Sequence, residues 1–114
     1  MSRMIYHMCR AEEWAAAVAT GSYRGSTQDL ADGFMHFSTG AQIVESARRH
    51  RAGQDGLLLV AVEAAKLGDR LKWEPSRGGD LFPHLYGPLD PAGSASVQPL
   101  PLAPDGLHVF PALE

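Results

Sequence analysis

The sequence has 114 residues and a mass of 12.3 kDa, which is the length of one domain, and we expect a single domain over residues 1–114. Hydrophobic residues make up 45% and charged residues 20% of the chain, a composition typical of globular rather than disordered proteins. The net charge of −3 and the lack of a broad basic stripe argue against duplex nucleic acid as a partner.

No apolar run approaches the roughly 20 residues that a membrane helix needs, so no membrane partner is expected. The start of the chain reaches polar residues at once and predicts no signal peptide. Cys9 is the single cysteine, and nothing therefore requires an oxidising compartment. These features predict a cytoplasmic protein, and we expect it to be a monomer or a weak dimer.

The first third of the chain predicts a strand, a helix and a helical turn. Residues 4–9 read as a short strand. Residues 11–20 read as a helix whose apolar stripe consists of Trp14, Ala17 and Val18. The segment Ser26-Thr27-Gln28-Asp29 resembles a capping box, which could start one helical turn.

A second strand and helix are predicted next. Residues 34–37 read as a very short strand. Thr39 with Gln42 forms another capping-box signal, so a helix is expected over residues 40–51 with Ile43, Val44 and Ala47 facing inward.

The second half of the chain predicts strands only. Residues 57–63 form a continuous apolar run, which indicates a central strand covered on both faces. Shorter strands are expected at 71–74, 96–100 and 107–110, the last two as edge strands because prolines surround them. Residues 81–89 are bracketed by prolines and cannot form a long helix. The fold class is therefore α+β, with mostly antiparallel strands and about two helices.

Common catalytic signatures are absent from the sequence, but three histidine motifs remain. The chain has no phosphate-binding Gly-rich loop, no His-Glu-x-x-His, no Cys-x-x-Cys and no Gly-x-Ser-x-Gly. The three motifs are Ile5-Tyr6-His7, Gly33-Phe34-Met35-His36-Phe37-Ser38-Thr39 and Phe82-Pro83-His84-Leu85-Tyr86-Gly87-Pro88.

Alternation along a strand places His36 and Ser38 on one face, from which both could look into one cleft. Ser38 or Thr39 also lies where a helix begins, and free backbone N–H groups there favour an anion. Either hydroxyl could equally be a simple helix cap. In the third motif His84 and Tyr86 share a face if the segment is extended, and an imidazole beside a hydroxyl can bind ribose or move a proton.

Three further polar residues are candidates for binding a substrate. Glu74 ends a predicted strand before a flexible loop, a usual place for a binding carboxylate. Arg77 lies beside two glycines and could hold a phosphate with two hydrogen bonds. Arg24 lies in the loop before the second motif. The alternative for the first two is a surface turn with a Glu74–Arg77 ion pair.

Together the three motifs resemble those of a family of small bacterial proteins catalogued as a domain of unknown function, whose pattern runs IYH, GFIHFST and FPHLYGPL. The resemblance covers residues 4 to about 100, and the main departure within the motifs is Met35 in place of Ile. Members of this family are similar in fold to ADP-ribosyltransferases. The resemblance thus implies an ADP-ribosylation-like fold, in which two small, mostly antiparallel sheets form a split barrel around a cleft that holds NAD in the active enzymes.

The resemblance also implies roles for individual residues. His7 looks like the first-strand histidine that holds the adenosine ribose, and His36 with Ser38 looks like the group beside the nicotinamide ribose. Many active enzymes have a glutamate at the third position, whereas this sequence offers His84 and Tyr86 there.

Three hypotheses follow. The first is an NAD- or nucleotide-linked enzyme of ADP-ribosyltransferase type, with a nucleotide-like small molecule as its ligand and no cofactor beyond NAD as a substrate. Its catalytic residues would be His7, His36, His84 and Tyr86, and its substrate-binding residues Ser38, Thr39, Arg24, Glu74 and Arg77. The second is a non-catalytic module that binds a nucleotide or another small ligand in the same cleft. The third is a zinc site formed by the three motif histidines, with an open position for water.

Overall fold

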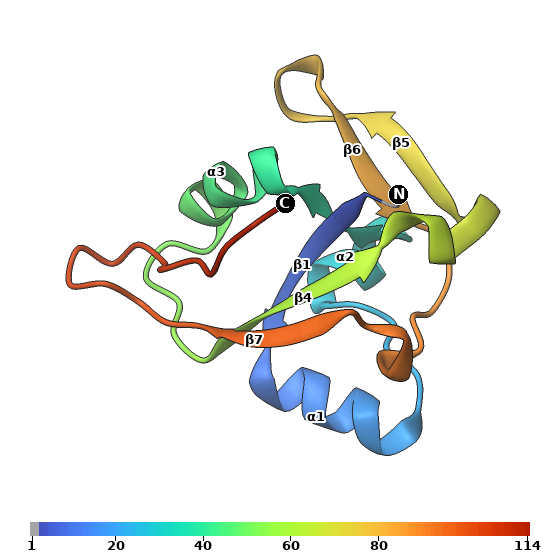
Figure 1. Ribbon diagram of the computed structural model, residues 1–114, viewed down its shortest axis with the longest axis horizontal. Coiled ribbons are helices and arrows are strands. Elements are labelled where there is room, and N and C mark those ends of the chain that lie inside the picture. The colour runs from blue at the N-terminus through green and yellow to red at the C-terminus, as the bar shows by residue number, and fades with distance from the viewer. Residues whose placement is uncertain (1–2) are drawn as a thin grey trace.

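Two antiparallel sheets organise the structure, a computed structural model that describes residues 3–114 (Figure 1). The larger sheet has the order β3-β1-β4-β7, formed by Ser38–Thr39, Met4–Arg10, Leu57–Glu63 and Ser96–Leu100. The smaller sheet has the order β2-β6-β5, formed by Met35–His36, Leu81–Leu85 and Leu71–Pro75. The prediction of an α+β fold with mostly antiparallel strands is confirmed, and neither sheet closes into a barrel within the described residues.

Helices join and cover these sheets. The α-helices are α1 (Ala11–Thr20), α2 (Thr27–Asp32) and α3 (Gly40–His50), and the short 3-10 helices are η1 (Ala64–Arg70), η2 (Arg77–Gly79) and η3 (Pro91–Gly93). The prediction of about two helices is therefore too low. Its main omission is α2, which the capping box at Ser26 had indicated only as a single turn. No helix among residues 3–114 is both long and apolar enough to cross a bilayer.

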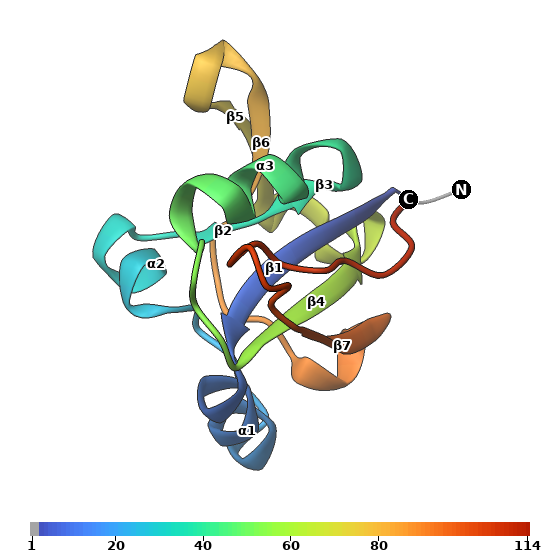
Figure 2. The ribbon, with the colours of Figure 1, turned by 90° about the vertical axis from the view of Figure 1, so that its left-hand side faces the viewer.

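The central strands β1 and β4 are buried on both faces. On one face Ile5 and Val60 belong to a core that also holds residues of α1 and of the smaller sheet. On the other face Tyr6 and Leu59 pack with Ile43 of α3 and with the C-terminal segment, which crosses in front of the larger sheet in Figure 2. The continuous apolar run at 57–63 is thus a central strand, as predicted.

The chain passes from one sheet to the other at Phe37. The expected single strand over 34–37 is in fact β2 in the smaller sheet, with β3 beginning one residue later in the larger sheet. Phe37 is buried between them, and its N–H donates to the carbonyl of Pro83. Because β3 pairs only with Ile5 and Tyr6, the same edge of β1 is left without a strand partner from His7 onward.

Three local expectations are wrong. Val18 and Val44 are 57% and 50% exposed, because α1 and α3 bury narrower stripes than predicted, and in α3 the polar Ser46 takes an inner place beside Ile43. The expected strand at 107–110 is not formed. Only an isolated bridge between Leu102 and His108 is present, in a segment whose prolines lack the N–H groups that a ladder needs.

Candidate functional site

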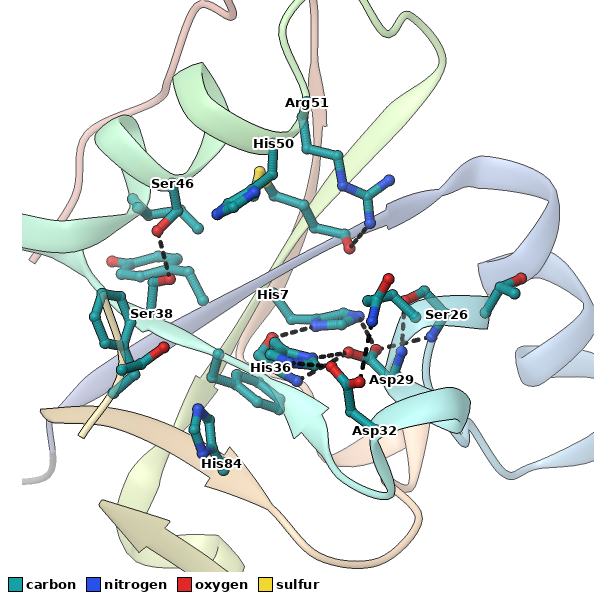
Figure 3. A pocket seen from close by; sticks show the side chains of 18 of the residues that line it. His7, Ser26, Asp29, Asp32, His36, Ser38, Ser46, His50, Arg51 and His84 are labelled. Atoms are coloured by element: carbon teal, nitrogen blue, oxygen red, sulfur yellow. Dashed lines mark hydrogen bonds and ion pairs between the residues drawn. The ribbon is translucent and has the colours of Figure 1, made fainter. Parts of the chain in front are cut away.

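A cleft of about 650 Å³ opens between the two sheets, α2 and α3 (Figure 3). This volume lies in the range of small-molecule sites. His7, His36 and His84 all line it, so the fold brings the histidines of the three sequence motifs to one cavity. The edge of β1 opposite β4 forms one wall, because among the described residues no strand pairs with that edge from His7 onward.

The strand register of the smaller sheet sets the distance between two of these histidines. His36 of β2 lies directly opposite His84 of β6, so both side chains emerge on the same face. Their ring centroids are 5.6 Å apart in an edge-to-face arrangement. Phe34 stacks on the His84 ring with centroids 4.2 Å apart and an angle of 28°, which fixes the plane of that imidazole.

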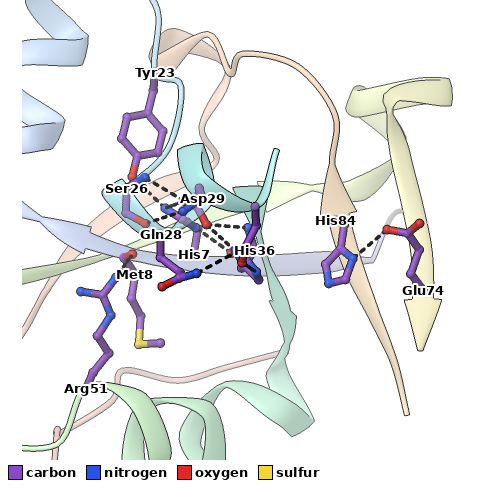
Figure 4. Close-up of polar contacts among 11 residues, drawn as sticks. His7, Met8, Tyr23, Ser26, Gln28, Asp29, His36, Arg51, Glu74 and His84 are labelled. Carbon is purple, nitrogen blue, oxygen red and sulfur yellow. Dashed lines mark hydrogen bonds and ion pairs between the residues drawn. The ribbon is translucent and has the colours of Figure 1, made fainter. Parts of the chain in front are cut away.

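A buried carboxylate, that of Asp29, holds His36 in place (Figure 4). The carboxylate accepts hydrogen bonds from the backbone N–H of Ser26 (2.8 Å), the backbone N–H of His36 (3.0 Å) and the Nδ1–H of His36 (2.5 Å). The first of these bonds belongs to the capping box that begins α2, because Asp29 is the third residue after the cap. One side chain thereby caps a helix and orients an imidazole.

His36 lies between two carboxylates. Its Nδ1 faces Asp29, and its Nε2 is 3.0 Å from an oxygen of Asp32. The hydrogen bond to Asp29 is the main cause that raises the pKa of His36, and it outweighs partial burial. Burial acts to raise the pKa of Asp29, but the bond from the His36 ring and the backbone N–H groups prevail and lower it to about 2. Both ring nitrogens of His36 thus face carboxylate oxygens, an arrangement whose hydrogen bonds the imidazolium form satisfies.

His7 is buried, and both of its ring nitrogens already have protein partners. Nδ1 donates to the carbonyl of His36 (2.7 Å), and Nε2 accepts from the hydroxyl of Tyr23 (2.8 Å). Burial is the main cause that lowers the pKa of His7, so the ring is neutral. Within this structure His7 ties β1 to β2 and supports the wall of the cleft.

The side of the cleft formed by α3 and the β5–β6 connection carries cations and hydroxyls. Ser46 is within 3.3 Å of the Ser38 hydroxyl and accepts from Nη1 of Arg77 at 3.3 Å. Arg51, at the end of α3, also lines the cleft while donating to the carbonyl of Met8. These four residues, Ser38, Ser46, Arg51 and Arg77, are called the cationic wall below, since two of them carry a guanidinium. Arg10 and Glu13 line the cleft as well and add one charge of each sign.

Glu74 contacts the Nδ1 side of the His84 ring from outside the cleft lining. Its Oε1 accepts from Nδ1 of His84 at 2.8 Å and from the hydroxyl of Tyr86 at 2.7 Å. The bond from Tyr86, followed by the bond from His84, lowers the pKa of Glu74. The alternative Glu74–Arg77 pair is not formed, since Glu74 is taken by these two donors and Arg77 reaches Ser46.

The structure thus divides the residues singled out from the sequence. The cleft is lined by His7, His36, His84, Ser38 and Arg77. The others lie outside its lining: Tyr86 and Glu74 behind His84, Thr39 buried at the start of α3, and Arg24 beside a separate depression of about 240 Å³.

Sequence reasoning missed Asp29, Asp32, Tyr23, Ser46 and Arg51 as site residues. Asp29 could have been noticed, because it belongs to the capping box that the sequence predicts at Ser26. A capping box does not show, however, that the second carboxylate oxygen binds an imidazole. Asp32 lies four residues before His36, a spacing that becomes informative only once a turn joins α2 to β2. Among residues 3–114 no group of three or more His, Cys, Asp or Glu is placed to hold a metal, so the motif histidines do not form the zinc site of the third hypothesis.

Comparison with known proteins identifies the family. Residues 8–97 match the sequence profile described as "Protein of unknown function (DUF952)", and the chain belongs to this family. The resemblance to a family of unknown function found from the motifs is therefore confirmed. No curated protein matches the chain.

Solved structures of one bacterial protein share the fold. The crystal structure of protein CC0527 from Caulobacter crescentus is 48% identical, has a TM-score of 0.90 and covers 93% of each chain. A double mutant of that protein, also solved by crystallography, is 47% identical with the same TM-score and coverage, 0.90 and 93% of each chain. Its solution NMR structure is 49% identical with a TM-score of 0.83, covering 91% of this chain and 90% of that one.

We expect Asp29→Asn to lower the free energy of unfolding by about 2–4 kcal/mol. The side-chain amide would turn a donor toward N–H groups that need an acceptor, and His36 would lose the nearer of its two counter-charges. Urea unfolding at pH 7 measures the change. Asp69→Asn is the matched control, since Asp69 is exposed, and its change should stay within about 0.5 kcal/mol. Equal stability of the two variants would contradict the role assigned to Asp29.

The raised pKa of His36 makes its contribution to stability depend on pH. A raised folded-state pKa gives stabilisation that is complete below the ordinary value of 6.5 and is lost as the pH rises through the folded-state pKa. On the acid side the partner Asp29 loses its charge as the pH falls from 3.8 through about 2. The stability difference between wild type and His36→Gln should therefore be greatest between pH 3.8 and 6.5. A difference that is constant from pH 5 to 9 in urea unfolding would argue against the ion pair.

Gly25→Ala tests how closely the loop before α2 approaches Asp29. Gly25 has a φ of +102°, and a Cβ there would lie 2.6 Å from the Cβ of Asp29. Gly53 also has a positive φ, +80°, but a Cβ there meets nothing within 4 Å, so Gly53→Ala controls for backbone strain alone. We expect Gly25→Ala to destabilise the protein by about 1–3 kcal/mol more than Gly53→Ala. Equal thermal unfolding temperatures for the two variants would refute this contact.

Proposed function

We propose that this protein binds a nucleotide such as NAD in the cleft and acts as an enzyme of ADP-ribosyltransferase type, transferring the ADP-ribosyl group with loss of nicotinamide. The observation that carries the proposal is the separation of charge inside one cavity. The cationic wall with Arg51 and Arg77 faces a corner in which Asp29 and Asp32 surround the imidazolium of His36.

The charge of that corner supports a reacting group that becomes positive. Two carboxylates and one imidazolium sum to a charge of −2 + 1 = −1. Asp32 is the more exposed of the two acids, with a side chain that is 36% exposed against 3% for Asp29. A fixed negative charge favours the positive charge that develops on a ribose as its C1′–N bond to nicotinamide breaks.

The opposite wall supports binding of phosphate. Arg77 presents a guanidinium that fits phosphate oxygens, and Ser38 and Ser46 add hydroxyl donors beside it. NAD joins a cationic nicotinamide riboside to an anionic diphosphate, so both ends of the cleft meet a complementary charge. The motif resemblance drawn from the sequence points to the same ligand.

A second candidate is a non-catalytic module that binds a nucleotide in the same cleft. The observation that favours it is the engagement of both ring nitrogens of His7 and of both ring nitrogens of His36 by protein groups. In this case the protein would bind NAD or ADP-ribose and release no nicotinamide.

Calorimetric titration with ADP-ribose and NAD tests the proposal. We expect saturable binding below millimolar concentration, weakened about tenfold by Arg77→Ala, because a partly exposed charged hydrogen-bond donor is lost. Arg49→Ala is the matched control, since Arg49 lies on α3, pairs with Glu45 and lies outside the cleft lining. No binding of either ligand at millimolar concentration would overturn the proposal, and equal effects of the two variants would remove the phosphate role of Arg77.

A further inference from the structure

The pair formed by Glu74 and His84 has the geometry of a carboxylate-oriented general base. In the β5–β6 ladder Glu74 pairs with Phe82, which places it diagonally across from His84 on the same face of the sheet. The bond from Nδ1 of His84 to Glu74 fixes the proton of the neutral ring on Nδ1 and leaves a lone pair on Nε2.

Nε2 of His84, the nitrogen that Glu74 does not contact, lies on the side of the ring toward the cleft. Within residues 3–114 no protein group hydrogen-bonds to Nε2 of His84, and the ring lines the cavity. Figure 4 shows Glu74 on one side of this imidazole and the His36 cluster on the other. The ring cannot turn freely, because Phe34 stacks on it and the residue is 5% exposed.

Glu74 is itself held in position by a second donor. The hydroxyl of Tyr86 donates to the same oxygen that accepts from His84, so the carboxylate has a defined orientation outside the cleft lining. This arrangement makes Glu74 a positioning residue that acts through His84.

We propose that His84, oriented by Glu74, is the general base that takes the proton of a hydroxyl acceptor, either water or an alcohol, during transfer of the ADP-ribosyl group. This inference rests on the proposed function and adds to it the acceptor class and the path of the proton. The C1′–N bond breaks and nicotinamide leaves with the electron pair. The acceptor oxygen forms the new C1′–O bond, and its proton moves to Nε2 of His84, whose positive charge Glu74 then balances.

The position of His84 fits this step. Its ring centroid is 5.6 Å from that of His36, so the base lies beside the negatively charged corner in which the ribose is proposed to sit.

The test measures nicotinamide release from NAD in water and the yield of the methyl glycoside of ADP-ribose when methanol is added. We expect His84→Gln to lower turnover by about 10²–10⁴-fold and Glu74→Gln by about 10–100-fold, since in the second variant the imidazole stays but a carboxylate no longer holds its proton on Nδ1. Affinity for ADP-ribose should change less than about twofold in both. Glu12→Gln, which alters an exposed acid of α1, is the charge-matched control and should behave as wild type.

Nitrogen-15 NMR of the His84 imidazole shows which ring nitrogen carries the proton. A purely structural Glu74–His84 pair would not link a change in that position to a loss of turnover. In the wild type we expect the neutral His84 ring to carry its proton on Nδ1, and in Glu74→Gln to carry it partly on Nε2. A wild-type ring protonated on Nε2 would overturn the proposal. It would also fail if Glu74→Gln and His84→Gln turned NAD over as fast as wild type, or if both lost ADP-ribose binding in parallel with turnover.

The same measurements separate this inference from the function on which it rests. If the wild type releases nicotinamide and both variants remain fully active, the proposed function is supported and the role of the Glu74–His84 pair (the dyad) is refuted. Wild-type protein that binds NAD without releasing nicotinamide supports the binding module and also removes the dyad. Failure of the wild type to bind either ligand overturns both.

Discussion

The buried carboxylate of Asp29 is the interaction on which the rest of the cleft depends. A charged group removed from water is strongly destabilising unless donors replace its hydration, and here the backbone of Ser26, the backbone of His36 and the ring of His36 do so. Since these donors come from the start of α2 and from β2, satisfying one charge fixes a helix against a strand of the smaller sheet. The bond from His7 to the carbonyl of His36 then connects this unit to the larger sheet.

The electrostatic character of the cleft follows from where the chain changes sheets. Phe37 carries the backbone from β2 to β3, which leaves an edge of β1 open and lets α2 and α3 face each other across the gap. Helix α2 brings Asp29 and Asp32 to one side, while α3 brings Arg51 to the other. A net charge of −3 over the whole chain conceals this separation, because it is a property of the fold and not of the composition.

Local patterns in the sequence predicted local structure well. The apolar run at 57–63 gave the central strand, and the capping residues at Ser26 and Thr39 marked the starts of two helices, because both signals depend on neighbours in the chain. The change of sheet at Phe37 could not be predicted from the sequence. The alternation of side chains along residues 34–39 is the same whether these residues form one strand or two short strands in different sheets. The exposure of Val44 has a similar cause, because the inner face of α3 is set by the strands beneath it and by a polar cavity that accepts Ser46.

The motif histidines differ in chemistry because of residues outside their motifs. His7 meets a carbonyl and the Tyr23 hydroxyl, and burial lowers its pKa, whereas His36 meets two carboxylates, which favour its imidazolium form. His84 meets one carboxylate, that of Glu74, and its Nε2 has no hydrogen-bond partner among residues 3–114. An imidazole has two nitrogens, and the partner of one decides what the other can do. The histidine pattern therefore locates the cleft, while Glu74 and the acids of α2 set which ring nitrogens of His36 and His84 already have a protein partner.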